Sequence, residues 1–117
     1  MKKNDKNFEK NLIKRLTIIC DDYKLISHGF SWLTHAVNFK DIPQSLTITC
    51  VYDTEQQLIN ANDNGNNQTL VNAIIREISE LGITIKPRKN LVRFDSEEAC
   101  DLSHNGNWQA RLKVKLH

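Results

Sequence analysis

The chain has 117 residues and a formal net charge of +2. This length fits one domain that can bury a core without disulfides or metals. The near balance of charge gives no global signal for nucleic acid or a membrane surface. No apolar run approaches the roughly 20 residues that a membrane span needs. The basic N-terminus lacks the apolar segment of a signal peptide, so we expect a cytoplasmic protein.

Three cysteines are spread over the chain, at Cys20, Cys50 and Cys100. Their number is odd, and no CxxC pair occurs. Such spacing argues against a disulfide framework and predicts reduced thiols.

The first half of the sequence predicts a helix followed by two strands. Residues 1–7 are polar and expected to be frayed, and from Phe8 apolar residues recur at steps of three and four, which predicts a helix over about 5–24. Alternating patterns predict strands at 30–39 and 46–53. Because a short loop around Pro43 joins them, we expect an antiparallel hairpin.

The second half is organised around a long core-facing helix, predicted after a short helix at 55–61. Over 67–81 an apolar stripe has helical spacing, and Gly82 follows where a helix most often ends in a left-handed residue. Residues 83–85 and 91–94 read as further strands. Asp95 predicts the cap of a short helix, with Glu98 completing a capping box.

The tail from Trp108 to Leu116 fits two structures. Apolar and polar residues alternate, which predicts a strand with one basic face. Trp108, Leu112 and Leu116 also lie four residues apart, as in a helix. We favour the strand.

The sequence thus predicts a single α+β domain over 1–117. Its antiparallel sheet would have about four strands, with a fifth from the tail, and helices mainly on one face.

Few residues suggest catalysis or metal binding. Cys100 and His104 lie four apart and would share a helix face, as zinc ligands do, but no second close pair completes a site. A nucleophilic Cys100 would need a cationic neighbour, whereas Glu97 and Glu98 precede it. We expect no cofactor and no catalytic residues, and the remote metal candidates are Cys100 and His104.

Nucleic-acid binding has more support, because the basic residues fall in three clusters. They comprise Lys10 and Lys14 in the first helix, Arg88 and Lys89 in a turn, and Arg111 and Lys113 in the tail. If the clusters share one face, they form a phosphate-binding surface on which Trp108 could stack a base. The alternatives are solvated helix faces and a core tryptophan. A protein-interaction module, such as a homodimer using a sheet edge or the tail, is the second functional hypothesis.

Several segments resemble a family of small uncharacterised bacterial proteins that are often labelled Fis-family transcriptional regulators. They are 29–35, 50–54, 92–100 and 104–112. The label would imply a helix-turn-helix, whereas Gly82, Pro87 and the strand-like 83–94 predict none there. The resemblance supplies no catalytic residues.

The order of elements is also similar to that of the type II KH-like domain of ribosome-binding factor A. In the present chain, however, the 64–67 segment, Asn-Gly-Asn-Asn, does not match the GxxG clamp of RNA-binding KH domains.

Overall fold

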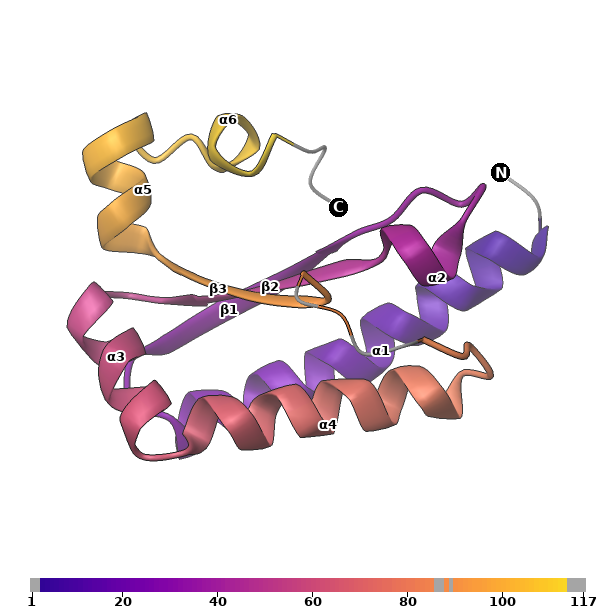
Figure 1. The fold of residues 1–117 in the computed structure, drawn as a ribbon, viewed down its shortest axis with the longest axis horizontal. Helices are drawn as coiled ribbons and strands as arrows, with labels where there is room; N and C mark the ends of the chain where they lie inside the picture. The colour runs from indigo at the N-terminus through magenta and orange to yellow at the C-terminus, as the bar shows by residue number, and fades with distance from the viewer. Residues whose placement is uncertain (1–2, 86–87, 89, 114–117) are drawn as a thin grey trace.

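The fold is a three-stranded sheet with two long helices on one face and two short helices on the other (Figure 1). This computed structural model describes residues 3–85, 88 and 90–113. The elements are α1 (Lys3–Ile26), β1 (Phe30–Ala36), α2 (Ile42–Ser45), β2 (Thr47–Tyr52), α3 (Glu55–Asp63), α4 (Asn66–Glu80), β3 (Val92–Ser96), α5 (Glu97–His104) and α6 (Trp108–Leu112). Residues 3–7, expected to be frayed, form the first turns of α1.

The sheet is mixed, with the strand order β1-β2-β3. β1 and β2 pair antiparallel as expected, but β3 runs parallel to β2. The prediction of a four-stranded antiparallel sheet is therefore wrong. The helices α3 and α4 carry the chain back to the end where β2 begins, and the next strand must then run in the same direction. Residues 83–85 form no strand, although Ile83 and Ile85 pack against the core.

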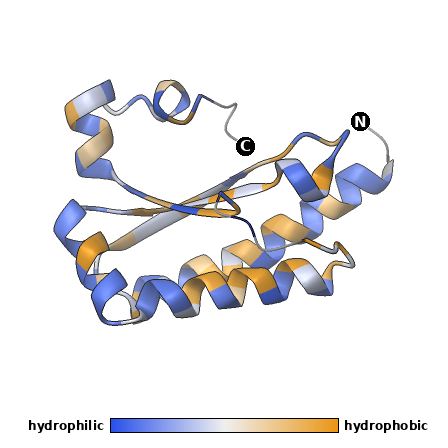
Figure 2. Ribbon diagram, viewed as in Figure 1, coloured by the Kyte–Doolittle hydropathy of each residue, from blue (hydrophilic) through white to orange (hydrophobic). Residues whose placement is uncertain are grey.

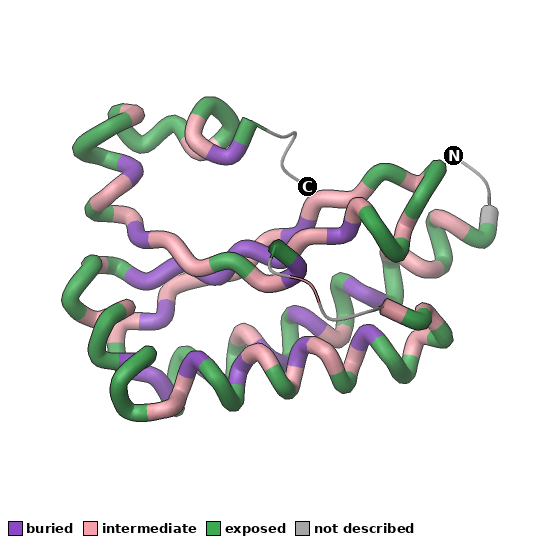
Figure 3. The backbone as a smooth tube through the Cα atoms, in the orientation of Figure 1, coloured by how far each residue is buried: buried purple, intermediate pink, exposed green. Residues whose placement is uncertain are grey.

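The main core lies between the sheet and the helices α1 and α4. Figure 2 shows apolar residues recurring along both helices, and Figure 3 shows buried residues along the strands and on the helix sides. The fully buried side chains here include Leu12, Leu70, Ile74, Ile48 and Cys50. The stripe predicted for α4 is thus the core-facing side of that helix. Gly82 has φ +84°, which confirms the left-handed residue predicted at its end.

The opposite face of the sheet is covered in part by α5 and α6. The strand predicted for the tail is wrong over 108–112. The Asn107 side chain instead caps a helical turn by accepting a hydrogen bond from the Ala110 N–H at 3.0 Å. Residues 114–116 lie outside the described residues. The cap of α5 is Ser96, whose hydroxyl accepts from the Ala99 N–H, and not Asp95 as predicted.

Candidate functional site

Arg111 is partly buried and is paired with Asp95. The guanidinium donates from Nε to Oδ2 at 2.6 Å and from Nη2 to Oδ1 at 2.9 Å. The hydrogen bond to Asp95 raises the pKa of Arg111 further above its ordinary value. Its Nη1 also donates to the Ser103 hydroxyl. Arg111 therefore joins α6 to β3 and α5, and its charge is already matched by a carboxylate.

Trp108 is likewise engaged within the domain. Its ring meets Trp32 of β1 edge to face, with 4.9 Å between the ring centroids. Both indole N–H groups donate to one carboxylate, that of Glu97, from Trp32 at 2.5 Å and from Trp108 at 3.3 Å. An aromatic pair that shares a carboxylate in this way fastens α5 and α6 to the sheet. Neither the pair nor its carboxylate had a signal in the sequence.

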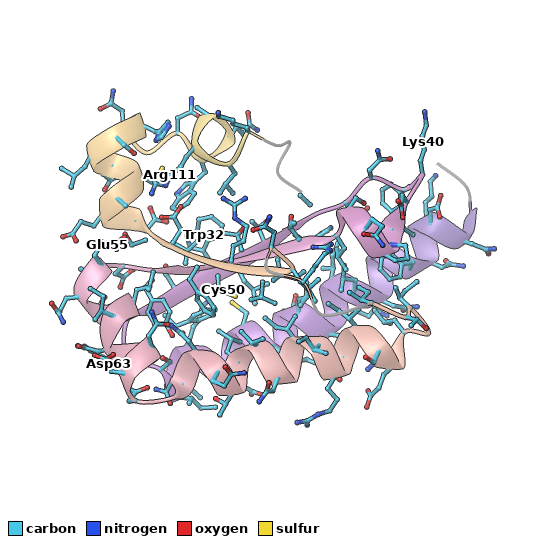
Figure 4. All side chains as sticks on the ribbon, viewed as in Figure 1. Trp32, Lys40, Cys50, Glu55, Asp63 and Arg111 are labelled. Carbon is cyan, nitrogen blue, oxygen red and sulfur yellow. The ribbon has the colours of Figure 1, made fainter. Side chains whose placement is uncertain are left out.

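Several of the other basic residues lie toward one end of the molecule, whereas Lys24, Arg76 and Arg93 do not belong to that group. We define the basic end by the exposed lysines of the first half of α1 and by the two cations near α2, namely Lys6, Lys10, Lys14, Lys40 and Arg88. Lys40 precedes α2 and lies at the same end as the start of α1 (Figures 1 and 4). Arg88 donates from Nη2 to the Leu46 carbonyl, just after α2. Of the other predicted residues, Lys89 lies outside the described residues and Lys113 is exposed after α6.

Carboxylates also lie at the basic end, so the separation of charge is partial. Asp5 precedes Lys6 in α1, and Asp41 follows Lys40 as the N-cap of α2. Three other carboxylates there already have partners. Arg15 Nη1 forms ion pairs with Glu77 Oε2 at 3.4 Å and with Glu80 Oε2 at 2.8 Å. The Glu9 carboxylate oxygen Oε2 lies 3.0 Å from His35 Nε2. In the described part of the chain, Lys10 and Lys14 form no ion pair. Their charges are therefore available to an outside anion.

A group of acidic residues lies at the opposite end, which α3 and α5 form. This acidic end comprises Asp53, Glu55, Asp63, Glu97, Glu98 and Asp101. Figure 4 places Glu55 and Asp63 at the far end of the long axis from Lys40. A Glu98 carboxylate oxygen accepts from the Glu55 N–H at 3.2 Å, which joins α5 to the start of α3. The segment from 53 to 75 contains no lysine or arginine, so the α3–α4 turn lacks the charge that a phosphate site needs.

The predicted thiol candidate is not organised for chemistry. Cys100 is fully buried, and burial raises the pKa of its thiol, with only a partial opposing effect from Arg111. A neutral thiol is a poor nucleophile and a poor metal ligand. His104 Nδ1 is hydrogen bonded to the Ser103 hydroxyl at 2.6 Å. Across the described ranges, no group of three or more His, Cys, Asp and Glu residues could hold a metal ion.

A groove that the sequence analysis missed runs between α1 and β1. It encloses about 410 Å³ and is lined by apolar, polar and charged residues, among them Ile13, Thr17, Cys20, Lys24 and Leu33. Burial raises the pKa of Cys20, against smaller lowering effects of Lys24 and of a hydrogen bond with the Leu33 backbone. The spacing of Ile13, Thr17 and Cys20 along one side of α1 is the only trace of the groove in the sequence.

Comparisons with protein-family models, with curated proteins and with solved structures give no match. Both resemblances drawn from the sequence therefore stay predictions. Among the described residues from 83 to 96 there is no helix. No helix in the described chain combines the length and the apolar character that crossing a membrane requires.

Proposed function

We propose that this is a small non-enzymatic cytoplasmic protein that binds the phosphate backbone of nucleic acids. The carrying observation is that Lys10 and Lys14, which form no ion pair in the described chain, lie at the basic end, opposite the acidic end. Lys10 and Lys14 lie one turn apart on α1, and both are exposed. They form the centre of the proposed contact, with Lys6, Lys40 and Arg88 around them.

Charge separation suits such a role even though the net charge is small. Lysines that contact phosphates release bound counterions from the nucleic acid, and this supplies most of the sequence-independent affinity. The acidic end is repelled by the same backbone, so the protein would approach with one orientation. Arg111 and Trp108, predicted as contacts from the sequence, are left out because Asp95 and Trp32 already engage them.

Fluorescence anisotropy with a short labelled RNA and a DNA duplex tests the proposal at low and at moderate salt. We expect binding at low salt that weakens as salt rises, because phosphate contacts are exchanged for counterions. The variant carrying Lys10→Glu and Lys14→Glu should bind weakly to both probes.

Lys24→Glu is the matched control for this experiment. Lys24 is an exposed lysine near the other end of the same helix, in its last turn. Its reversal changes the net charge without touching the basic end, so binding should weaken less than in the variant with two changes. Absence of binding at low salt, or equal losses per charge in the two variants, would contradict the proposal.

A protein-interaction role is the second candidate function. It is favoured by the position of β1 at the edge of the sheet, beside the groove on α1.

A further inference from the structure

The outer edge of β1 presents backbone groups away from the sheet. The Ile48 N–H donates to the Leu91 carbonyl at 2.8 Å, toward β3. Because peptide groups of successive strand residues point to alternate sides, Thr49 turns its groups toward β1 and pairs there with Thr34. Leu33, next to Thr34, therefore points its N–H and C=O out of the sheet. No strand of the described chain lies along this edge.

The sequence of β1 lacks the usual protection of an edge strand. Natural edges are commonly blocked by charged side chains, proline or bulges. The strand reads Phe-Ser-Trp-Leu-Thr-His-Ala, without lysine, arginine, acidic residues or proline. A register shift lies between Phe30 and Trp32, but pairing is regular from Trp32 to Ala36. The strand at the other edge, β3, carries Arg93 and Asp95.

The groove on α1 continues this edge into a surface for side chains. Leu33 and Cys20 lie in its lining, and Ile13 and Thr17 come from the α1 wall. Ile13 is 44% exposed, a large fraction for an isoleucine beside the core. A strand edge next to an apolar helix wall is the arrangement by which proteins add an extended segment, through backbone hydrogen bonds and alternate side chains. The thiol of Cys20 is a weak partner for the Leu33 backbone, so a strand carbonyl would replace it readily.

We propose that a second copy of this chain occupies the site, with its own β1 paired antiparallel to the first across a two-fold axis. Two identical edges can pair in this way because a two-fold interface uses the same surface from both copies. The distribution of charge along the molecule favours this antiparallel pairing. β1 runs along the longest axis, between the acidic and the basic ends (Figure 1). A two-fold axis reverses that direction, so the basic end of each copy lies beside the acidic end of its partner.

The proposed dimer goes beyond nucleic-acid binding and does not depend on it. It competes with phosphate contacts, because the acidic end of each copy lies beside the basic end of its partner. It forms a continuous sheet through both copies, with the two α1 helices on the same side. Backbone pairing of β1 stabilises it, and so does burial of Ile13 and Leu33. Because the ends attract each other, added salt should weaken the dimer.

Sedimentation equilibrium over a range of protein concentrations tests the dimer. We expect the average mass to rise from one chain toward two as the concentration rises, and to do so less at high salt. Ile13→Lys should shift the protein to a monomer. Ile18→Lys is the matched control, since Ile18 is an exposed isoleucine of the same helix, 63% exposed, that is not part of the groove lining. A mass of one chain at every concentration, or equal effects of the two variants, would overturn the proposal.

Alkylation of Cys20 gives a second readout on the unaltered chain. Cys20 is half-buried in the groove, whereas Cys50 and Cys100 are fully buried and serve as internal references. The dimer should protect Cys20, so its alkylation rate constant should fall as protein concentration rises, and it should not fall in Ile13→Lys. A rate constant independent of concentration in the unaltered chain would overturn the proposal even if Ile13→Lys failed to fold.

Discussion

The two faces of the sheet are covered in different ways. On one face, α1 and α4 bury a wide apolar stripe against Ile48 and Cys50. On the other, α5 and α6 are short and are fastened by a few specific contacts: the Asp95–Arg111 pair and the two tryptophans that share Glu97. The first face depends on many interchangeable apolar contacts, and the second on a few polar partners that must all be present.

The two faces should therefore differ in local stability. Burial of many apolar side chains gives a region that opens only when the whole domain unfolds. A short helical segment with few buried side chains can open by itself. We therefore expect α5 and α6 to open locally, at a lower cost than global unfolding.

The largest loss of stability should come from the α1–α4 face. Ile78 is 1% exposed, and Ile78→Ala removes buried methyl groups and leaves a cavity. We expect the free energy of unfolding to fall by about 2–5 kcal/mol, measured by urea denaturation. Ile18→Ala, at a 63% exposed position of α1, is the control and should change little. A loss at Ile78 no larger than at Ile18 would reject the core-facing orientation of α4.

A smaller loss is expected on the other face from Asp95→Asn. The change removes the charge that Arg111 faces, while the side-chain volume stays nearly the same. Both side chains are largely buried, with 15% and 23% exposure, so the unpaired guanidinium should cost about 1–3 kcal/mol. Amide hydrogen exchange should speed up in α5 and α6 and not in α4. Equal acceleration in α4 would show that the two faces open together.

Gly82→Ala tests the exit of α4 with a smaller effect still. An added Cβ at Gly82 meets nothing within 4 Å, so only the left-handed backbone, at φ +84°, opposes the change. We expect a loss of about 1 kcal/mol in the free energy of unfolding. Unchanged stability in thermal denaturation would contradict the left-handed conformation.

The reaction rates of Cys50 and Cys100 report on the two faces in the unaltered protein. Cys50, in β2, lies in the core under α1 and α4, and Cys100 is on the buried side of α5. Burial raises the pKa of both thiols. Both thiols should therefore stay protonated and react slowly at neutral pH. Because α5 can open locally, Cys100 should react faster than Cys50 with a thiol reagent, when the modified residues are identified by mass spectrometry. The reverse order would contradict the comparison.

The sequence predicted the α1–α4 face far better than the other. Helical spacing marks the stripe of α4, and Gly82 marks its end, because both signals are local. The strand predicted at 91–94 corresponds to β3, but its parallel direction was missed, because direction depends on the path of α3 and α4, which no local pattern records. The helix α6 was missed because Trp108 and Leu112 fit both periods, and the choice was made by the Asn107 cap and by packing on Trp32.

The candidate site was predicted only in part, for a related reason. Charge and exposure on α1 can be read from helical spacing, which placed Lys10 and Lys14 on the surface. Arg111 is unavailable to an outside anion because it pairs with Asp95, sixteen residues away along the chain. No spacing rule connects the two residues. The charge separation likewise arises only when the fold brings α3 and α5 to one end and α2 to the other.

The dependence of nucleic-acid affinity on salt tests the proposed function most directly. Each lysine in contact with a phosphate of duplex DNA contributes about 0.9 to the slope of log affinity against log salt concentration. We predict that Lys10→Glu with Lys14→Glu makes that slope shallower by about 1.8, the contribution of two phosphate contacts. Lys24→Glu should leave the slope nearly unchanged. A slope near zero in the unaltered protein, or the same slope in all three proteins, would contradict a phosphate-binding basic end.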